Sequence, residues 1–351
     1  MRTTKTTRFA KCRSGAETGL FGKAKAWLDN PEQTDSVKSS VISPCDLPGT
    51  LPSNVVRPWL SPIGSRDAPP GARAAAWMLQ REIILLLAWG PAILLQFAHP
   101  LVARGVADHS AFRTERWGRP RRLHRTLEAM LRLCFGTERE ALAAAARINA
   151  IHDHVHGRLS HAAGIFPKGT PYSAHDPALL AWVHATLLEM NLRVYELFVA
   201  PLRVEDKDRC CVEASSIEGL FGIPEGHLPR SVSELQRYMD GMYASGEISV
   251  TDAARTLSRA LVYPQVPLVS EPAIRFMRLT TMGLLPPTIR ADYGFPWSAR
   301  HEAMLRLLAA LVRTFLPLTP PILRYWPAAR TAARAASGSG CPLRMRPGGG
   351  S

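Results

Sequence analysis

The stretch Ile83-Ile-Leu-Leu-Leu-Ala-Trp-Gly-Pro-Ala-Ile-Leu-Leu-Gln-Phe-Ala-His99-Pro100-Leu-Val-Ala103 contains 21 residues and no Asp, Glu, Lys or Arg. Its length would allow it to cross a membrane, which takes about 20 apolar residues. Gly90 and Pro91 interrupt it in the middle, and Gln96 and His99 add polar groups near its end. Such interruptions are typical of helices buried in a protein core. We therefore expect two buried helices broken at Gly90–Pro91, with the fold built around them.

Helix signals follow this stretch along the chain. Thr137 and Glu140 have the spacing of a capping box, and they open an alanine-rich helix that is expected to run to His156. Asp176 followed by Pro177 predicts the start of another helix. Further helices are expected over residues 122–135, 204–221, 231–245, 251–261, 273–282 and 298–315, with a polar turn at 105–110 and irregular chain at 160–173 and 284–297. There is no β-alternation and no internal repeat, so the predicted class is all-α.

The ordered body is predicted to span residues 71–325. Residues 1–70 are rich in Ser, Pro and basic residues, and residues 326–351 are rich in Ala, Gly and Arg, so both are expected to be disordered tails. The net charge is +14, and part of it lies in the block 113–125, which carries six arginines and one glutamate. This block has no recognition-helix or aromatic-stacking pattern, so specific nucleic-acid binding is not favoured.

Cysteine usage and the N-terminus indicate a compartment. None of the six cysteines forms a C-x-x-C pair, which argues against a zinc knuckle and against a disulfide framework. The basic N-terminus is not followed by the apolar segment of a secretory signal. We expect reduced thiols and a cytoplasmic protein, with membrane association left open.

Three histidines, His152, His154 and His156, lie at the end of the alanine-rich helix. If the helix continues through them, His152 and His156 share a face and His154 points away. Neutral imidazole is the commonest protein metal ligand, so an inward-facing histidine is a candidate iron ligand, and a surface or core histidine is the competing interpretation. His156 adjoins Gly157 at the helix end, where the dipole favours the protonated form. The carboxylates of a zinc or di-iron motif are missing, so a hydrolytic metal site is not expected.

Two other helices carry candidate pocket residues. Arg122 and Thr126 are four residues apart and share a helix face, with Met130 one turn further on. A guanidinium can bind a carboxylate through two hydrogen bonds, and a threonine hydroxyl can donate to a ligand oxygen. The competing interpretation is a solvated arginine face. His184 lies in an apolar helix, as a core histidine or as the wall of a pocket.

The order of these motifs resembles the latex-clearing protein (rubber oxygenase) and MpaB oxygenase family. The resemblance extends from about residue 77 to about residue 297, and the ordered series makes it specific. The motifs are Leu94-Leu-Gln-Phe-Ala-His99-Pro100, Gly105-Val-Ala-Asp108-His109-Ser110, Arg122-Leu-His-Arg125-Thr126, Phe135-Gly136-Thr137, Ile151-His152-x-x-Val155-x-Gly157, Trp182-Val-His184-Ala-Thr186-Leu, Phe221-Gly-Ile-Pro224 and Leu285-Pro-Pro-x-x-Arg290-x-x-Tyr293-Gly294.

This resemblance implies an all-α, globin-like domain that holds haem b through one histidine and uses dioxygen to cleave carbon–carbon double bonds in isoprenoid chains. By position in the motifs, His152 would be the iron ligand, and Arg122 and Thr126 would be the catalytic pair on the opposite side. The residue before that threonine is a lysine in rubber oxygenases and Arg125 here, which puts ligation by a distal lysine in doubt. Arg125, as a partner for a haem propionate, and His184 complete the expected cofactor-binding residues.

The expected function is a haem-dependent oxygenase that acts with dioxygen on an apolar, unsaturated, isoprenoid-like small molecule. The uncharged stretch would supply a dry wall for haem and substrate. The alternative function is a non-catalytic helical protein that binds haem or lipid at a membrane surface, which the basic tails and the uncharged stretch support.

Overall fold

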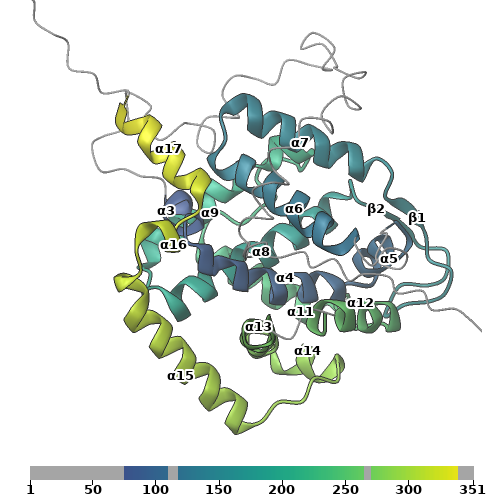
Figure 1. Ribbon diagram of the computed structural model, residues 1–351. Helices are drawn as coiled ribbons and strands as arrows, with labels where there is room; N and C mark the ends of the chain where they lie inside the picture. Colours follow the sequence, from purple (N-terminus) through teal and green to yellow (C-terminus); the bar gives the residue numbers. More distant parts are fainter. Residues whose placement is uncertain (1–74, 110–117, 265–269, 339–351) are drawn as a thin grey trace, which may run out of the picture. The chain divides into compact units, whose positions relative to one another are not determined.

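The computed structural model of the protein describes residues 75–109, 118–264 and 270–338, without the side chains of residues 118–124 and 336–338. The expected tail at residues 1–70 and the segment 339–351 lie outside the described residues. The described elements are α3 (Ala75–Gln80), η3 (Ile83–Leu85), α4 (Leu86–Ala98), α5 (Pro100–His109), α6 (Gly118–Phe135), α7 (Glu138–His152), β1 (His156–Arg158), β2 (Pro171–Ser173), α8 (Pro177–Phe198), α9 (Val204–Ser215), α10 (Glu218–Phe221), α11 (Val232–Ala244), α12 (Asp252–Val262), α13 (Glu271–Gly283), α14 (Pro287–Asp292), α15 (Ala299–Phe315), η6 (Leu316–Leu318), α16 (Pro321–Arg324) and α17 (Pro327–Gly338) (Figure 1). Helices dominate this part of the chain, which confirms the predicted all-α class.

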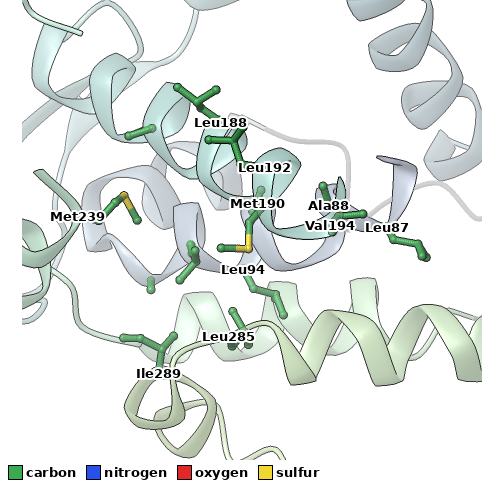
Figure 2. Close-up of a cluster of buried hydrophobic side chains, with 14 of the residues drawn as sticks. Leu87, Ala88, Leu94, Leu188, Met190, Leu192, Val194, Met239, Leu285 and Ile289 are labelled. Atoms are coloured by element: carbon green, nitrogen blue, oxygen red, sulfur yellow. The ribbon is translucent and has the colours of Figure 1, made fainter. Parts of the chain in front are cut away.

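Helix α4, formed by the uncharged stretch, lies at the centre of the packing and contacts α8, α12 and α13. Ala92, Leu94 and Leu95 are fully buried. Leu94 belongs to a cluster of apolar side chains that includes Met190 of α8 and Leu285, which precedes α14 (Figure 2). Burying a side chain of this size contributes about 1.5–3 kcal/mol to folding, so α4 supplies much of the core.

The bend in the uncharged stretch lies at His99, and the prediction of a break at Gly90–Pro91 was wrong. Helix α4 continues through Pro91, and the axes of the Ile83–Ala98 and Pro100–His109 segments differ in direction by 103°. His99 has an extended backbone, with φ −83° and ψ 117°. The residue before a proline is disfavoured in the helical region, so Pro100 explains the position of the bend.

Gly90 has a packing role instead. A Cβ atom built at this position would overlap Thr281 Oγ1 of α13, and it would lie 3.1 Å from Thr281 Cβ. The absence of a side chain at Gly90 therefore lets α4 and α13 approach closely.

Among the described residues, no single helix is long and apolar enough to cross a membrane, and only the bent pair formed by Ile83–Ala98 and Pro100–His109 meets that test together.

We expect Gly90→Ala to lower the free energy of unfolding by about 1–3 kcal/mol, because the added methyl group overpacks the contact with Thr281. Gly241 in α11 is the matched control, because a Cβ there meets no atom within 4 Å. Gly241→Ala should be neutral or stabilising by up to about 1 kcal/mol, which is the helix preference for alanine over glycine. Urea unfolding measures both changes. Equal stabilities for the two variants would contradict the packing role.

Three further segments differ from the sequence prediction. Residues 105–109, predicted as a turn, continue α5, and an ion pair of 2.6 Å joins Arg104 to Asp108 one turn later. The predicted helix over residues 204–221 is two helices, α9 and α10. The predicted turn over residues 284–297 contains the short helix α14, which begins at the second of two prolines, where the missing N–H costs nothing.

Two helices, α16 and α17, follow residue 320, and the second of them lies in the tail that the sequence predicted to be disordered from residue 326. Arg324 at the end of α16 binds the buried carboxylate of Glu82 through hydrogen bonds of 2.7 and 2.8 Å. Trp326 N–H then donates to the carbonyl of Arg81 at 3.0 Å. Helix α17 packs against α6 in the segment that was expected to be a disordered tail. These contacts are with residues far away in the sequence, so local composition does not reveal them.

Candidate functional site

Helix α7 positions His152 and ends there. The helix begins with the predicted capping box, in which the Thr137 side chain accepts from Glu140 N–H and the Glu140 carboxylate accepts from Thr137 N–H. It ends at His152, four residues earlier than predicted, because the following chain leaves the helix to form β1. Gly157 of β1 pairs with Tyr172 of β2 in a two-stranded antiparallel sheet.

The early end of α7 changes the relation between the three histidines. His156 lies in β1 and His154 in the turn before it, and both are exposed. The prediction that His152 and His156 share a helix face was therefore wrong. His152, which is the last residue of the helix, is the partly buried member of the three.

His152 has a buried ring nitrogen. Its Nδ1 is shielded from solvent and has no hydrogen-bond partner among the described residues. The ring lies edge-on to that of His175, with the centroids 5.7 Å apart, and His175 Nε2 lies 2.7 Å from Asp153 Oδ1. Burial, followed by the nearby charge of His175, lowers the pKa of His152, and Asp153 opposes this shift. The imidazole is therefore neutral near pH 7, which is the form that binds iron.

A second group of residues fixes the chain just after His152. A Cβ atom on Gly157 would lie 2.5 Å from Tyr172 Oη, so only glycine leaves room for this ring. Tyr172 Oη donates to Asp108 Oδ2 at 2.7 Å, and Asp108 is also paired with Arg104. Burial and the Asp108 carboxylate raise the pKa of Tyr172 to about 12, so the phenol remains a donor. These contacts anchor β1, the strand that follows His152, to α5. They connect Gly157 of one family motif with Asp108 of another through Tyr172.

His184 is the second histidine with an unpartnered nitrogen. It lies on α8, and its Nε2 is buried without a hydrogen-bond partner among the described residues. The motif around it attaches α8 to α4: Trp182 Nε1 donates to the carbonyl of Leu95 at 3.2 Å, and Gln96 Nε2 donates to Thr186 Oγ1 at 3.2 Å. His184 is therefore held in position on a helix that is fixed to the core.

Burial lowers the pKa of His184 to about 4. The unfolded chain, with a histidine pKa near 6.5, binds more protons than the folded state between these values, so stability rises with pH across that window. We expect the protein to lose about 2 kcal/mol through this group between about pH 7 and pH 5. His184→Leu should remove that part of the loss, whereas His154→Leu, at an exposed position, should leave it in place. Urea unfolding at the two pH values tests this, and equal pH dependence in all three proteins would contradict it.

Helix α6 carries the other predicted site residues. Arg122 lies in α6, but its side chain is outside the described part of the structure. Arg125 and Thr126 are exposed. Met130, one turn beyond Thr126, lines a cavity of about 30 Å³ together with Leu187 and Asn191 of α8, among other residues. His184 lies on the same helix, three residues before Leu187, but it is not among the residues that line the cavity.

Sequence reasoning missed three residues near these histidines. Tyr172 lies in the segment 160–173, which was expected to be irregular, and His175 lies between that segment and the Asp176-Pro177 capping signal. Asn149, one turn before His152, donates from Nδ2 to the carbonyl of Leu220 at 2.9 Å, and its buried Oδ1 has no partner within the described part of the chain. No sequence pattern singled it out.

Among the described residues, no three His, Cys, Asp or Glu side chains gather as a metal site. This finding does not bear on haem, which needs one or two protein ligands.

Of the comparisons with known proteins, the one with protein families agrees with the resemblance. No curated protein matches the chain, and no solved structure matches it. The family model described as ER-bound oxygenase mpaB/B'/rubber oxygenase, catalytic domain, matches residues 76–314. This match runs from α3 into α15 and includes the segments that carry Thr126, His152 and His184. The chain therefore belongs to the mpaB and rubber oxygenase catalytic-domain family.

Proposed function

We propose that this protein is a haem b-dependent oxygenase that uses dioxygen to cleave or oxygenate an apolar, unsaturated, isoprenoid-like molecule, with His152 as the iron ligand. Membership of an oxygenase catalytic-domain family supports the reaction class. The observation that carries the haem proposal is the neutral, partly buried imidazole of His152, whose Nδ1 has no hydrogen-bond partner in the part of the chain that the structure describes. A buried polar group without a hydrogen-bond partner costs about 1–3 kcal/mol. Binding of iron by the His152 ring would offset that cost.

The donor chemistry at the site fits haem. His152 and His184 are both held in the neutral form by burial, and neutral imidazole is the usual protein ligand of haem iron. Bound haem would supply the activation of dioxygen, which amino-acid side chains do not provide. The cavity between α6 and α8 holds about 30 Å³, whereas cofactor pockets measure several hundred Å³. Neither His152 nor His184 is among the residues that line this cavity, so haem held by either ring would need more space than the cavity provides.

The residues of α6 have roles that follow from their chemistry. Thr126 would donate a hydrogen bond from its hydroxyl to an oxygen atom of the ligand, and Arg122 would stabilise negative charge there. Arg125 replaces the lysine of rubber oxygenases and is always protonated, so it suits a haem propionate better than the iron. The apolar side chains of α6 and α8 around Met130 would exclude water from the reacting group.

The absorption spectrum of the purified full chain after haem supplementation tests this proposal. A Soret band that stays with the protein through gel filtration is expected, and no such band would reject haem binding. Oxygen uptake on addition of a prenylated lipid then separates the oxygenase from the alternative. Stable haem binding without oxygen uptake for any prenylated substrate tried would favour a non-catalytic haem protein.

A further inference from the structure

A second cavity lies between α14 and the start of α15 (Figure 1). Its volume is about 470 Å³, which is in the range of pockets for small organic molecules. Its walls include Phe295 and Trp297, in the loop between the two helices, and Ser298 and Ala299, where α15 begins. It shares no lining residue with the cavity between α6 and α8. It is therefore a separate place for a ligand.

Arg290 of α14 lines this cavity, and its side chain is only 7% exposed. Nη2 donates to the carbonyl of Leu285 at 3.0 Å, whereas the buried Nε has no hydrogen-bond partner among the described residues. The guanidinium carbon lies 4.5 Å from the centre of the Trp297 ring, another wall of the cavity. Burial lowers the pKa of Arg290 and Glu302 opposes this shift, but an arginine side chain stays protonated in proteins. A buried positive charge with an unused N–H group therefore lies at the cavity wall.

The acidic groups of the protein do not neutralise this charge. Glu302 acts on it from a distance, but the Glu302 carboxylate accepts from Arg306 Nε at 3.0 Å and from Trp297 Nε1 at 3.3 Å. In the part of the chain that the structure describes, no carboxylate forms an ion pair with Arg290. A buried charge without a counter-charge is costly. An anion from outside the chain would supply the missing partner.

The start of α15 adds a second group of donors at the same cavity. Ser298 is the N-cap residue of this 17-residue helix, but its side chain makes no capping hydrogen bond and lies 2.9 Å from His301 Nδ1 instead. The first N–H groups of α15 are therefore left without the usual cap. They carry the positive end of the helix dipole, which favours an anion. Because Ser298 and Ala299 line the cavity, this end of the helix and Arg290 lie at the same space.

The aromatic walls indicate which kind of anion fits. Phe295 stacks on Tyr293 with ring centroids 5.3 Å apart, and Trp297 packs so closely on α13 that a Cβ on Gly283 would lie 2.7 Å from its ring. Both rings are therefore held in place before a ligand arrives. An inorganic anion would leave these walls in water, whereas an apolar group would cover them. A planar carboxylate also matches the geometry of a guanidinium.

We propose that this cavity binds a small organic carboxylate with an apolar body. Arg290 and the backbone N–H groups at the start of α15 bind the carboxylate, and the body lies along Phe295 and Trp297. This site gives the arginine of the last family motif a role that haem chemistry does not use. Binding requires neither haem nor catalysis, so the site stands or falls separately from the oxygenase proposal.

Calorimetric titration of the full chain with octanoate tests this proposal. We expect saturable binding, and octanamide, which lacks the charge, should bind at least about tenfold more weakly. Arg290→Met should weaken octanoate binding by at least the same factor. Arg278→Met is the matched control, because the Arg278 guanidinium lies 4.6 Å from the Tyr263 ring and its Nε donates to a carbonyl, away from this cavity. The control should bind octanoate like the unmodified chain.

A second variant keeps the test valid if Arg290→Met does not fold. Ala291 is exposed and lines the cavity, so Ala291→Trp fills the space without removing a buried group, and it should also lose octanoate binding by at least about tenfold. Three results would overturn the proposal: no saturable octanoate binding, equal binding of octanoate and octanamide, or unchanged binding by Ala291→Trp. Inorganic phosphate that binds as tightly as octanoate would overturn the role of the apolar walls.

Discussion

His152→Ala is expected to abolish the native haem spectrum, while His154→Ala keeps it. His152 is the last residue of α7 and His154 lies two residues later, so they form a matched pair. His152 is partly buried and its Nδ1 has no partner among the residues described, whereas His154 is exposed in the turn before β1. Removing an axial ligand changes the electronic state of the iron completely, so the expected effect is loss of the native Soret band rather than a shift of a few nanometres.

Two further measurements make this comparison decisive. Imidazole added to His152→Ala should restore a six- or five-coordinate spectrum if the variant has lost only the ligand, and circular dichroism should show an unchanged fold. Because burial lowers the pKa of His152, the imidazole stays neutral somewhat below pH 6.5, so ligation should persist in mild acid. A native spectrum in His152→Ala would reject this residue as the ligand, and His184 would then be the next candidate.

The sequence predicted the helices whose ends are set by local chemistry. The Asp176 side chain accepts from Ala178 N–H and starts α8, and the Thr137–Glu140 box starts α7, as their spacing indicated. Both signals act within four residues of the chain, so no tertiary contact is needed to detect them. Gly136 ends α6 for the same kind of reason, with its N–H bonded to the carbonyl of Arg132.

Features that depend on distant residues were predicted poorly. The end of α7 was predicted at His156, directly before Gly157, whereas pairing of Gly157 with Tyr172 takes the chain out of the helix after His152. The break in the uncharged stretch was placed at Gly90, whose lack of a side chain serves a contact with Thr281 nearly 200 residues later. In each case a long-range contact outweighed a local preference.

The candidate site shows the same division. The family motifs named His152, His184 and Thr126, but they did not show what holds these residues in place. In the structure, Gly157 contacts Tyr172, and Tyr172 donates a hydrogen bond to Asp108. Tyr172 belongs to none of the family motifs. A single tyrosine in an irregular segment carries no local signal, because its role depends on where α5 lies.

The ion pair between Arg324 and Glu82 should have the largest effect on stability of any contact considered. The Glu82 side chain is fully buried, and Arg324 binds both of its oxygens, at 2.7 and 2.8 Å. Arg324→Ala would leave a buried carboxylate without its main partner, which typically costs about 3–5 kcal/mol. Arg81 Nε is 4.0 Å from the same carboxylate and would compensate in part, so we expect about 3 kcal/mol.

Arg275→Ala is the matched control, because Arg275 forms an ion pair of 3.0 Å with Glu271 on the surface of α13. Exposed pairs of this kind contribute at most about 1 kcal/mol, so urea unfolding should separate the two variants clearly. In Arg324→Met/Glu82→Leu both charges are removed and the volume is kept, so much of the lost stability should return. If Arg324→Ala loses no more stability than Arg275→Ala, α16 is anchored by something other than this ion pair.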